Sequence, residues 1–235
     1  MSILKPALFF VSVVLLSSCN TNDIETPGRV QPRDIFFDYK IWGEEGKNEV
    51  TCLLQFRYRR ESGRTVKLDS PSHVEVDGEL ISADSARLTG SFYEIQKPIH
   101  EFIGKHTITV KDVNDNEYIE EFTFQPFTLP QELPDTIYRN DLIFNIQGLK
   151  PIDYLRVIAI DTSFISDDIN EIDTLKMGKL IISKEKLEKL VNGPVTLLLN
   201  KEEESPVKNG TARGGKISVT YSLKRQLILM DQPGE

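Results

Sequence analysis

The sequence predicts a β-hairpin in the residues His106-Thr-Ile-Thr-Val-Lys-Asp-Val-Asn-Asp-Asn-Glu-Tyr-Ile-Glu-Glu-Phe-Thr-Phe124. Side chains alternate between the two faces of a strand, so His106, Ile108 and Val110 share one face. The turn falls at residues 114–116, because asparagine and aspartate tolerate the left-handed backbone that tight turns require. We therefore expect two antiparallel strands here.

The same alternation continues toward the N-terminus and covers residues 34–127, with turn residues at short intervals. Strands are expected at residues 35–42, 49–59, 66–68, 72–76, 79–82, 92–96, 106–112 and 117–124. This pattern predicts an all-β sandwich, and Asp77-Gly78 marks a second tight turn within it. Together with the hairpin, it resembles the later part of an immunoglobulin-like bacterial surface domain.

A proline-rich segment follows at residues 128–135, where Pro130 and Pro134 remove backbone donors and stiffen the chain. We interpret it as a linker to a second domain over residues 136–231. The sequence thus predicts an all-β chain with two immunoglobulin-like β-sandwich domains in tandem. The roughly 215 residues from Cys19 onward suffice for two cores.

The second domain is expected to contain one short helix. Strands are predicted at residues 142–146, 154–160, 180–182, 195–199 and 217–223. Ser183 can cap a helix whose apolar stripe is Leu187, Leu190 and Val191, and Gly193-Pro194 would end it. The charged segment 200–215 is interpreted as a long mobile loop. This order of elements is similar to C-terminal domains of Bacteroidota lipoproteins, a resemblance that implies no activity.

Residues 1–18 have the layout of a signal peptide, with Lys5, an apolar run from Ala7 to Leu16, and two serines. Ten helical residues rise only about 15 Å, which is half of a hydrocarbon core of about 30 Å. The apolar run is therefore too short for a permanent membrane-spanning helix, and we interpret it as part of a signal. Leu16-Ser-Ser-Cys19 resembles the lipobox of bacterial lipoproteins. This implies removal of the signal and lipid on Cys19, whereas the alternative is an ordinary secretory signal followed by a chance cysteine.

The residues after Cys19 indicate where such a lipoprotein would reside. Asn20 stands where aspartate would imply retention in the inner membrane, so the outer membrane is favoured. Whether the protein faces the periplasm or the cell surface stays open. Residues 19–33 are polar and interrupted by prolines, and we interpret them as a flexible tether.

Composition excludes some partners and most chemistry. A formal charge of -8 repels phosphate backbones, so we expect no nucleic-acid partner. If Cys19 carries lipid, Cys52 has no intramolecular partner, and its alternating apolar context predicts a buried thiol. The three histidines are dispersed, and the sequence contains no G-x-S-x-G elbow or phosphate-binding glycine loop. We expect neither catalysis nor a cofactor.

Two groups of residues are candidates for ligand binding. Asp167, Asp168, Glu171 and Asp173 could supply oxygen ligands to Ca²⁺, although acidic loops are more often simply solvated. Trp42, with Tyr39 nearby, could stack on the apolar face of a sugar, or it could instead pack into the core.

The function predicted from sequence is that of a non-catalytic protein-interaction or assembly module in the envelope, held at the membrane by its lipid. A surface carbohydrate-binding accessory protein is the alternative.

Overall fold

The computed structural model describes residues 30–163 and 166–232, and it confirms the predicted all-β class. The predicted signal peptide, Cys19 and most of the predicted tether lie outside the described residues. Within the described ranges, no helix is long and apolar enough to cross a membrane.

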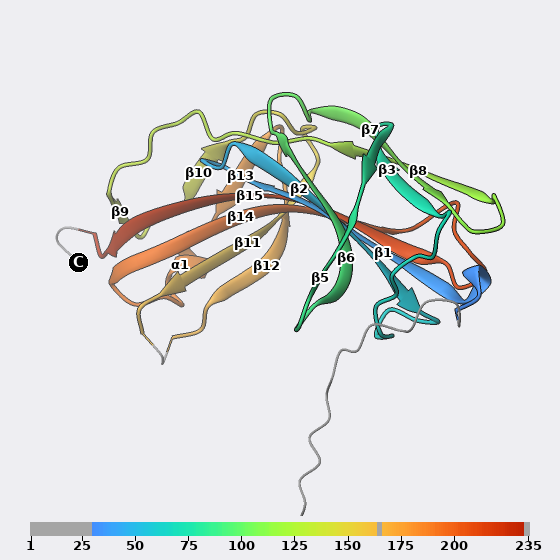
Figure 1. Ribbon diagram of the computed structural model, residues 1–235. Coiled ribbons are helices and arrows are strands. Elements are labelled where there is room, and N and C mark those ends of the chain that lie inside the picture. The colour runs from blue at the N-terminus through green and yellow to red at the C-terminus, as the bar shows by residue number, and fades with distance from the viewer. Residues whose placement is uncertain (1–29, 164–165, 233–235) are drawn as a thin grey trace, which may run out of the picture.

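One long sheet runs through the whole molecule (Figure 1). Its strands, in spatial order, are β12 (Ile169–Thr174), β11 (Tyr154–Asp161), β14 (Gly193–Pro206), β15 (Gly215–Met230), β1 (Ile35–Glu44), β2 (Glu49–Tyr58), β6 (Gly90–Pro98) and β5 (Ala83–Ala86), with β9 (Thr136–Tyr138) also paired to β15. β15 pairs with β14 along almost its whole length, while its first half also runs parallel to β1. The hairpin β14–β15 therefore joins the two halves of the chain.

Two smaller layers cover one side of the long sheet. The first is a four-stranded sheet ordered β4 (Glu79–Ile81), β3 (His73–Val76), β7 (Gly104–Lys111) and β8 (Glu117–Phe124). Its aromatic side chains pack on those of the long sheet, with ring centroids 5.4 Å apart for Phe37 and Tyr118 and 6.1 Å apart for Phe124 and Tyr221. β7 and β8 are the hairpin expected from the sequence.

The second layer is formed by β10 (Leu142–Asn145), β13 (Lys179–Ile182) and the helix α1 (Lys184–Leu187). Arg139, which follows β9, donates hydrogen bonds to the carbonyl oxygens of Leu187 and Leu190 and so ties the helical turn to the long sheet. Apolar side chains of both layers belong to one continuous core cluster. The two predicted sandwiches therefore share a sheet.

The prediction of a mobile loop at residues 200–215 was wrong. β14 continues to Pro206, and every residue from Asn200 to Pro206 has a partner on β15. Lys201 is 7 % exposed, because it points toward the covered side of the sheet. The connecting loop is limited to residues 207–214.

Three other features also differ from prediction. The helix α1 ends at Leu187, so Leu190 and Val191 of the predicted apolar stripe lie beyond it, and Gly193 and Pro194 begin β14. Residues 66–68 form no strand. The linker segment is packed against the protein, since Leu129 is 6 % exposed and Thr128 pairs with Gln147. At the end of the tether, a 3-10 turn, η1 (Pro32–Asp34), leads directly into β1.

The β7–β8 turn is held by the carboxylate of Asp112. One oxygen accepts hydrogen bonds from the backbone N–H groups of Asn114 (2.7 Å) and Asn116 (3.0 Å), and the other accepts from the Asn116 side chain (2.9 Å) and the Tyr118 hydroxyl. Burial opposes ionisation of this carboxyl, but these hydrogen bonds outweigh it and lower the pKa of Asp112. The turn predicted at residues 114–116 is thus held by the side chain of Asp112.

We expect Asp112→Ala to destabilise the protein by about 1–3 kcal/mol, because it leaves turn donors unsatisfied. The pKa of Asp112 is lower in the folded state, so its contribution to stability is present above pH 3.8 and is lost as the pH falls through the folded value. Urea unfolding of both proteins at pH 7 and at pH 3 measures this. If the unfolding free energies of Asp112→Ala and the unaltered protein differ by the same amount at pH 7 and at pH 3, the charge of Asp112 has no role in stability.

Candidate binding surface

The side of the long sheet opposite the two covering layers carries the exposed Trp42. Strand β1 places Phe37, Tyr39 and Ile41 in the core and turns its even-numbered residues toward this other side, which we call the open face. Trp42 is 41 % exposed there and takes part in none of the aromatic ring contacts found among the described residues. The prediction that left core packing as the alternative for Trp42 is thereby resolved in favour of exposure.

Small polar residues flank the indole ring. Trp42 lies opposite Thr51 of β2 and Thr220 of β15, and Thr220 in turn lies opposite Glu202 of β14. Tyr154, also 41 % exposed, donates a hydrogen bond from its hydroxyl to the carbonyl oxygen of Glu202 at 3.2 Å. The Tyr154 ring also lies 4.1 Å from the ammonium nitrogen of Lys201, which points toward the covered side, so Tyr154 lies at the edge of β14 and not beside Trp42.

Tyr39 does not join Trp42 at this surface. It is 1 % exposed and packs against Phe37 and Phe56, and burial raises the pKa of its hydroxyl well above the ordinary value. The physical reason is the two-residue period of a strand, which sends residues an odd number of positions apart to opposite faces. The predicted pairing of Tyr39 with Trp42 was therefore wrong, and Trp42 is the member of the pair that the open face exposes.

The open face becomes apolar toward the β12–β11 end. Ile160, Ile172 and Ile228 are 40 %, 60 % and 44 % exposed. A cavity of about 510 Å³ lies beside Ile160 and Ile228 and is bounded by Asp135 and Pro194. The lining of this cavity combines the exposed isoleucines with polar side chains, among them Thr196 and Gln226.

A second cavity, of about 540 Å³, lies at the junction of the two halves, where Phe124, Leu149 and Tyr221 supply apolar lining. Its most buried charge is Lys201, whose ammonium nitrogen lies 3.2 Å from a Glu203 oxygen, 3.5 Å from an Asp153 oxygen and 4.1 Å from the centroid of the Tyr154 ring. Two carboxylates and a ring face satisfy this ammonium, so Lys201 holds the start of β11 against β14.

The four acidic residues proposed as calcium ligands do not form a cage. Glu171 and Asp173 belong to the edge strand β12 and both form ion pairs with the ammonium group of Lys186, at 2.9 Å for Asp173. Asp167 and Asp168 precede that strand. Among the described residues, no group of three or more potential metal ligands comes together. The acidic segment is therefore a strand neutralised by a lysine.

Calorimetric titration with millimolar Ca²⁺ is expected to give no heat of binding, because the Lys186 ammonium occupies the position between the two carboxylates of β12. EDTA-treated protein is the starting material, and Lys186→Ala, which frees both carboxylates, is the matched comparison. A saturable heat with the unaltered protein would contradict this expectation.

Cys52 and His106, two other residues weighed for chemistry, have structural roles. Burial raises the pKa of the Cys52 thiol to about 12, so the prediction of an inert buried thiol is confirmed. The ring nitrogens of His106 lie 2.7 Å from an Asp77 oxygen and 3.1 Å from the carbonyl oxygen of Phe102, and its ring stacks on Phe102. These contacts fix the end of the β3–β4 turn against β7.

Comparisons with known proteins provide no family. No family model matches the chain, and no curated protein matches it. Among solved structures, the chain is similar to the crystal structure of DIP-gamma IG1+IG2 at 11 % identity and a TM-score of 0.23, covering 80 % of this chain and 94 % of that one.

Escherichia coli alpha-2-macroglobulin activated by porcine elastase gives 12 % identity and a TM-score of 0.26, over 83 % of this chain and 20 % of that one. The Bacteroides ovatus mixed-linkage glucan utilization locus SGBP-B, in complex with a mixed-linkage heptasaccharide, gives 10 % identity and a TM-score of 0.19. The match covers 78 % of this chain and 53 % of that one. At these scores the likenesses carry no functional assignment.

Proposed function

We propose that this chain is a non-catalytic binding protein of the bacterial envelope, and that it binds a neutral polysaccharide on the open face around Trp42. The observation that carries the proposal is the exposure of Trp42, 41 %, on the face of the long sheet that neither of the two smaller sheets formed by the described residues covers. An indole ring exposed in this way offers a flat apolar surface on which a ligand can stack.

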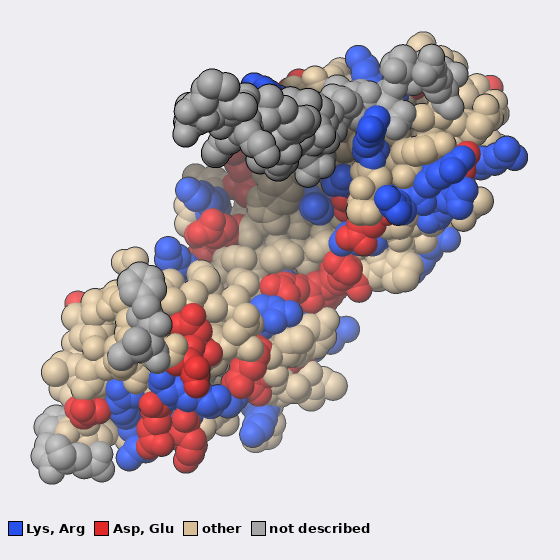
Figure 2. All heavy atoms as spheres, turned by 90° about the horizontal axis from the view of Figure 1, so that it is seen from below, with Lys and Arg blue, Asp and Glu red and all other residues tan. Residues whose placement is uncertain are grey.

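A sugar fits this surface because its ring has an apolar face and a rim of hydroxyl groups. The indole offers a flat surface for the former, and Thr51 and Thr220 on either side offer hydroxyl groups that donate and accept hydrogen bonds. A neutral glycan is favoured because the chain has a net charge of -8 and because acidic and basic side chains are interspersed on the side seen in Figure 2. No field of one sign is available there to attract a polyanion.

The sequence contains a single tryptophan, so its fluorescence reports directly on this surface. We expect a saturable change of Trp42 emission with at least one of cellohexaose, maltohexaose, laminarihexaose and mannohexaose. Emission that stays unchanged with all of them would refute glycan binding at Trp42.

A protein partner is the second candidate, and the exposed isoleucines at the β12–β11 end of the open face favour it. Affinity capture of the lipidated protein from its own envelope tests this candidate. The candidate is supported if one partner is captured by the unaltered protein and by Trp42→Ala but not by Ile172→Asp. If Ile172→Asp captures every partner that the unaltered protein captures, no partner binds at this end.

The lipid anchor on Cys19 is part of the proposal and rests on the lipobox resemblance of residues 16–19. Metabolic labelling with palmitate is expected to label the protein and not Cys19→Ser. Accessibility of intact cells to a protease distinguishes a surface-facing protein from a periplasmic one.

A further inference from the structure

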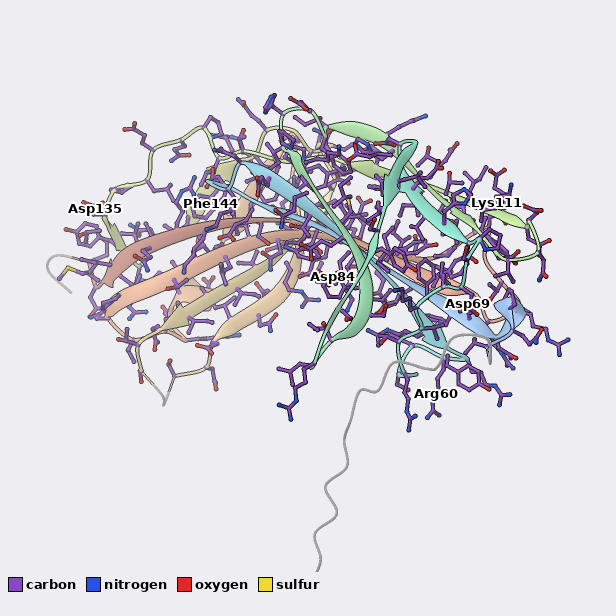
Figure 3. The ribbon with its side chains drawn as sticks, in the orientation of Figure 1. Arg60, Asp69, Asp84, Lys111, Asp135 and Phe144 are labelled. Atoms are coloured by element: carbon purple, nitrogen blue, oxygen red, sulfur yellow. The ribbon has the colours of Figure 1, made fainter. Side chains whose placement is uncertain are left out.

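A second polar site lies on the open face, two rows of residues away from Trp42. It is a cavity of about 410 Å³ lined by Asp38, Lys40, Arg57, Arg60, Glu61 and Ser62, which we call the Asp38 cavity. Strands β1 and β2 form its floor, and the loop after β2 forms its rim, where Arg60 is labelled in Figure 3. An ion pair between Lys216 and Glu61, 2.5 Å long, holds this rim against β15.

The floor of the cavity contains a buried carboxylate with one oxygen unused. The Asp38 side chain is 2 % exposed, and its Oδ2 accepts a hydrogen bond from Arg57 Nε at 2.7 Å. The ammonium group of Lys40 lies 3.8 Å from the same oxygen. Oδ1 is buried and has no hydrogen-bond partner among the described residues. A buried acceptor of this kind costs free energy until a donor reaches it, so Asp38 is prepared to receive one.

Arg57 is held too firmly to be that donor. Its Nη2 donates to Gln55 Oε1 at 2.6 Å, and its Nη1 faces the carbonyl oxygen of Gly63 at 3.4 Å. Gln55 is fixed in turn by its own bond to the carbonyl oxygen of Thr89. Three N–H groups of the Arg57 guanidinium are thus engaged, and none of them reaches Asp38 Oδ1.

The charges around the cavity select the chemistry of that donor. Lys40, Arg57 and Arg60 oppose a bound cation, and the carboxylates of Asp38 and Glu61 oppose a bound anion. A neutral hydroxyl group is repelled by neither set of charges. It can donate one hydrogen bond to Asp38 Oδ1 and accept another from Lys40 or Arg60.

We propose that the Asp38 cavity is a second sugar subsite, which binds hydroxyl groups of the same neutral glycan that stacks on Trp42. This inference rests on the proposed function and adds the polar end of the site. Asp38 and Trp42 point to the same face of β1 four residues apart, a separation of about 14 Å at about 3.4 Å per residue. A short oligosaccharide spans this distance and a single sugar does not.

Two spectroscopic signals separate the two sites in one titration. Fluorescence of Trp42 reports the ring surface, and the ¹⁵N–¹H resonance of Arg57 Nε, hydrogen-bonded to Asp38, reports the cavity. We expect cellohexaose, maltohexaose, laminarihexaose or mannohexaose to shift both signals with one dissociation constant. The corresponding disaccharides are expected to bind more weakly and to shift the two signals independently.

The outcomes are distinct. A hexasaccharide that changes Trp42 emission and leaves the Arg57 resonance in place overturns the second subsite and leaves the proposed function standing. A shift of Arg57 without any change at Trp42 supports the cavity and overturns the stacking role of Trp42. No change in either signal with all four sugars overturns both.

Substitutions provide an independent check. Asp38→Asn removes the charge, and Ser62→Phe fills the cavity from its rim without altering the Asp38–Arg57 pair. Each is expected to weaken hexasaccharide binding about tenfold, or about 1.4 kcal/mol, and disaccharide stacking on Trp42 much less. Lys224→Ala, on the same face but outside the cavity, is the matched control and should bind as the unaltered protein does. Unchanged hexasaccharide affinity in Ser62→Phe would refute the subsite even if Asp38→Asn failed to fold.

Discussion

Replacing Trp42 with alanine is expected to weaken glycan binding by more than about thirtyfold, the effect of losing an interaction worth about 2 kcal/mol. The change removes the exposed indole ring, and Thr51 and Thr220 beside it are too small to replace the stacking area. Isothermal titration with the best-binding hexasaccharide measures the loss. Trp42→Phe, which keeps a smaller ring, should retain an intermediate affinity.

Tyr138 provides a matched control for this prediction. It is 40 % exposed, close to the 41 % of Trp42, but it belongs to β9 at the far end of the long sheet. Tyr138→Ala should leave the affinity unchanged. Both variants should also unfold at nearly the same denaturant concentration as the unaltered protein, because exposed side chains contribute little to the core. Equal affinity of Trp42→Ala and the unaltered protein would show that the ligand binds elsewhere.

Much of the fold followed from the period of the side chains. The alternation around Cys52 placed the thiol in the core, and the residues from His106 to Phe124 formed the expected hairpin. These predictions succeeded because local patterns decide them: a strand with one apolar face packs with that face inward. The same rule, applied to the three-residue interval between Tyr39 and Trp42, was sufficient to separate them.

The extension of β14 could not be read from its own residues. Lys201 to Glu204 is a run of charges, which by itself favours a solvated loop. It forms a strand because β15 supplies backbone partners for each residue, and because Asp153 and Tyr154, far away in sequence, accept the ammonium group of Lys201. Tertiary contacts of this kind override a local preference.

The Asp38 cavity was likewise invisible in the sequence. Asp38 alternates with core residues, which predicts only an outward-facing polar side chain. Its burial depends on the loop after β2 folding over the open face, and its pairing depends on Arg57 from the neighbouring strand. A local pattern contains neither piece of information, whereas the exposure of Trp42 needed only the knowledge of which face stays uncovered.

The shared sheet leads to the second large effect, which is expected from Phe56→Ala. Phe56 is 0 % exposed, and its ring contacts those of Phe37, Tyr39 and Tyr93 edge to face at 5.4 Å, 6.3 Å and 5.3 Å. Truncating it removes these three aromatic contacts and leaves a cavity, for an expected loss of about 3–5 kcal/mol of unfolding free energy. This is a large part of the about 5–15 kcal/mol that stabilises an ordinary domain.

The loss should extend to the half of the protein that Phe56 does not touch. β15 pairs with β1 beside Phe56 and also with β14 and β9 at the far end, so the first half cannot unfold without removing the support of the second. Amide hydrogen exchange under native conditions measures this coupling. Exchange in β11 should accelerate about as much as exchange in β2, whereas Ile152→Ala, at a residue 77 % exposed, should change neither. Faster exchange confined to the first half would mean that the two halves unfold separately despite the strands they share.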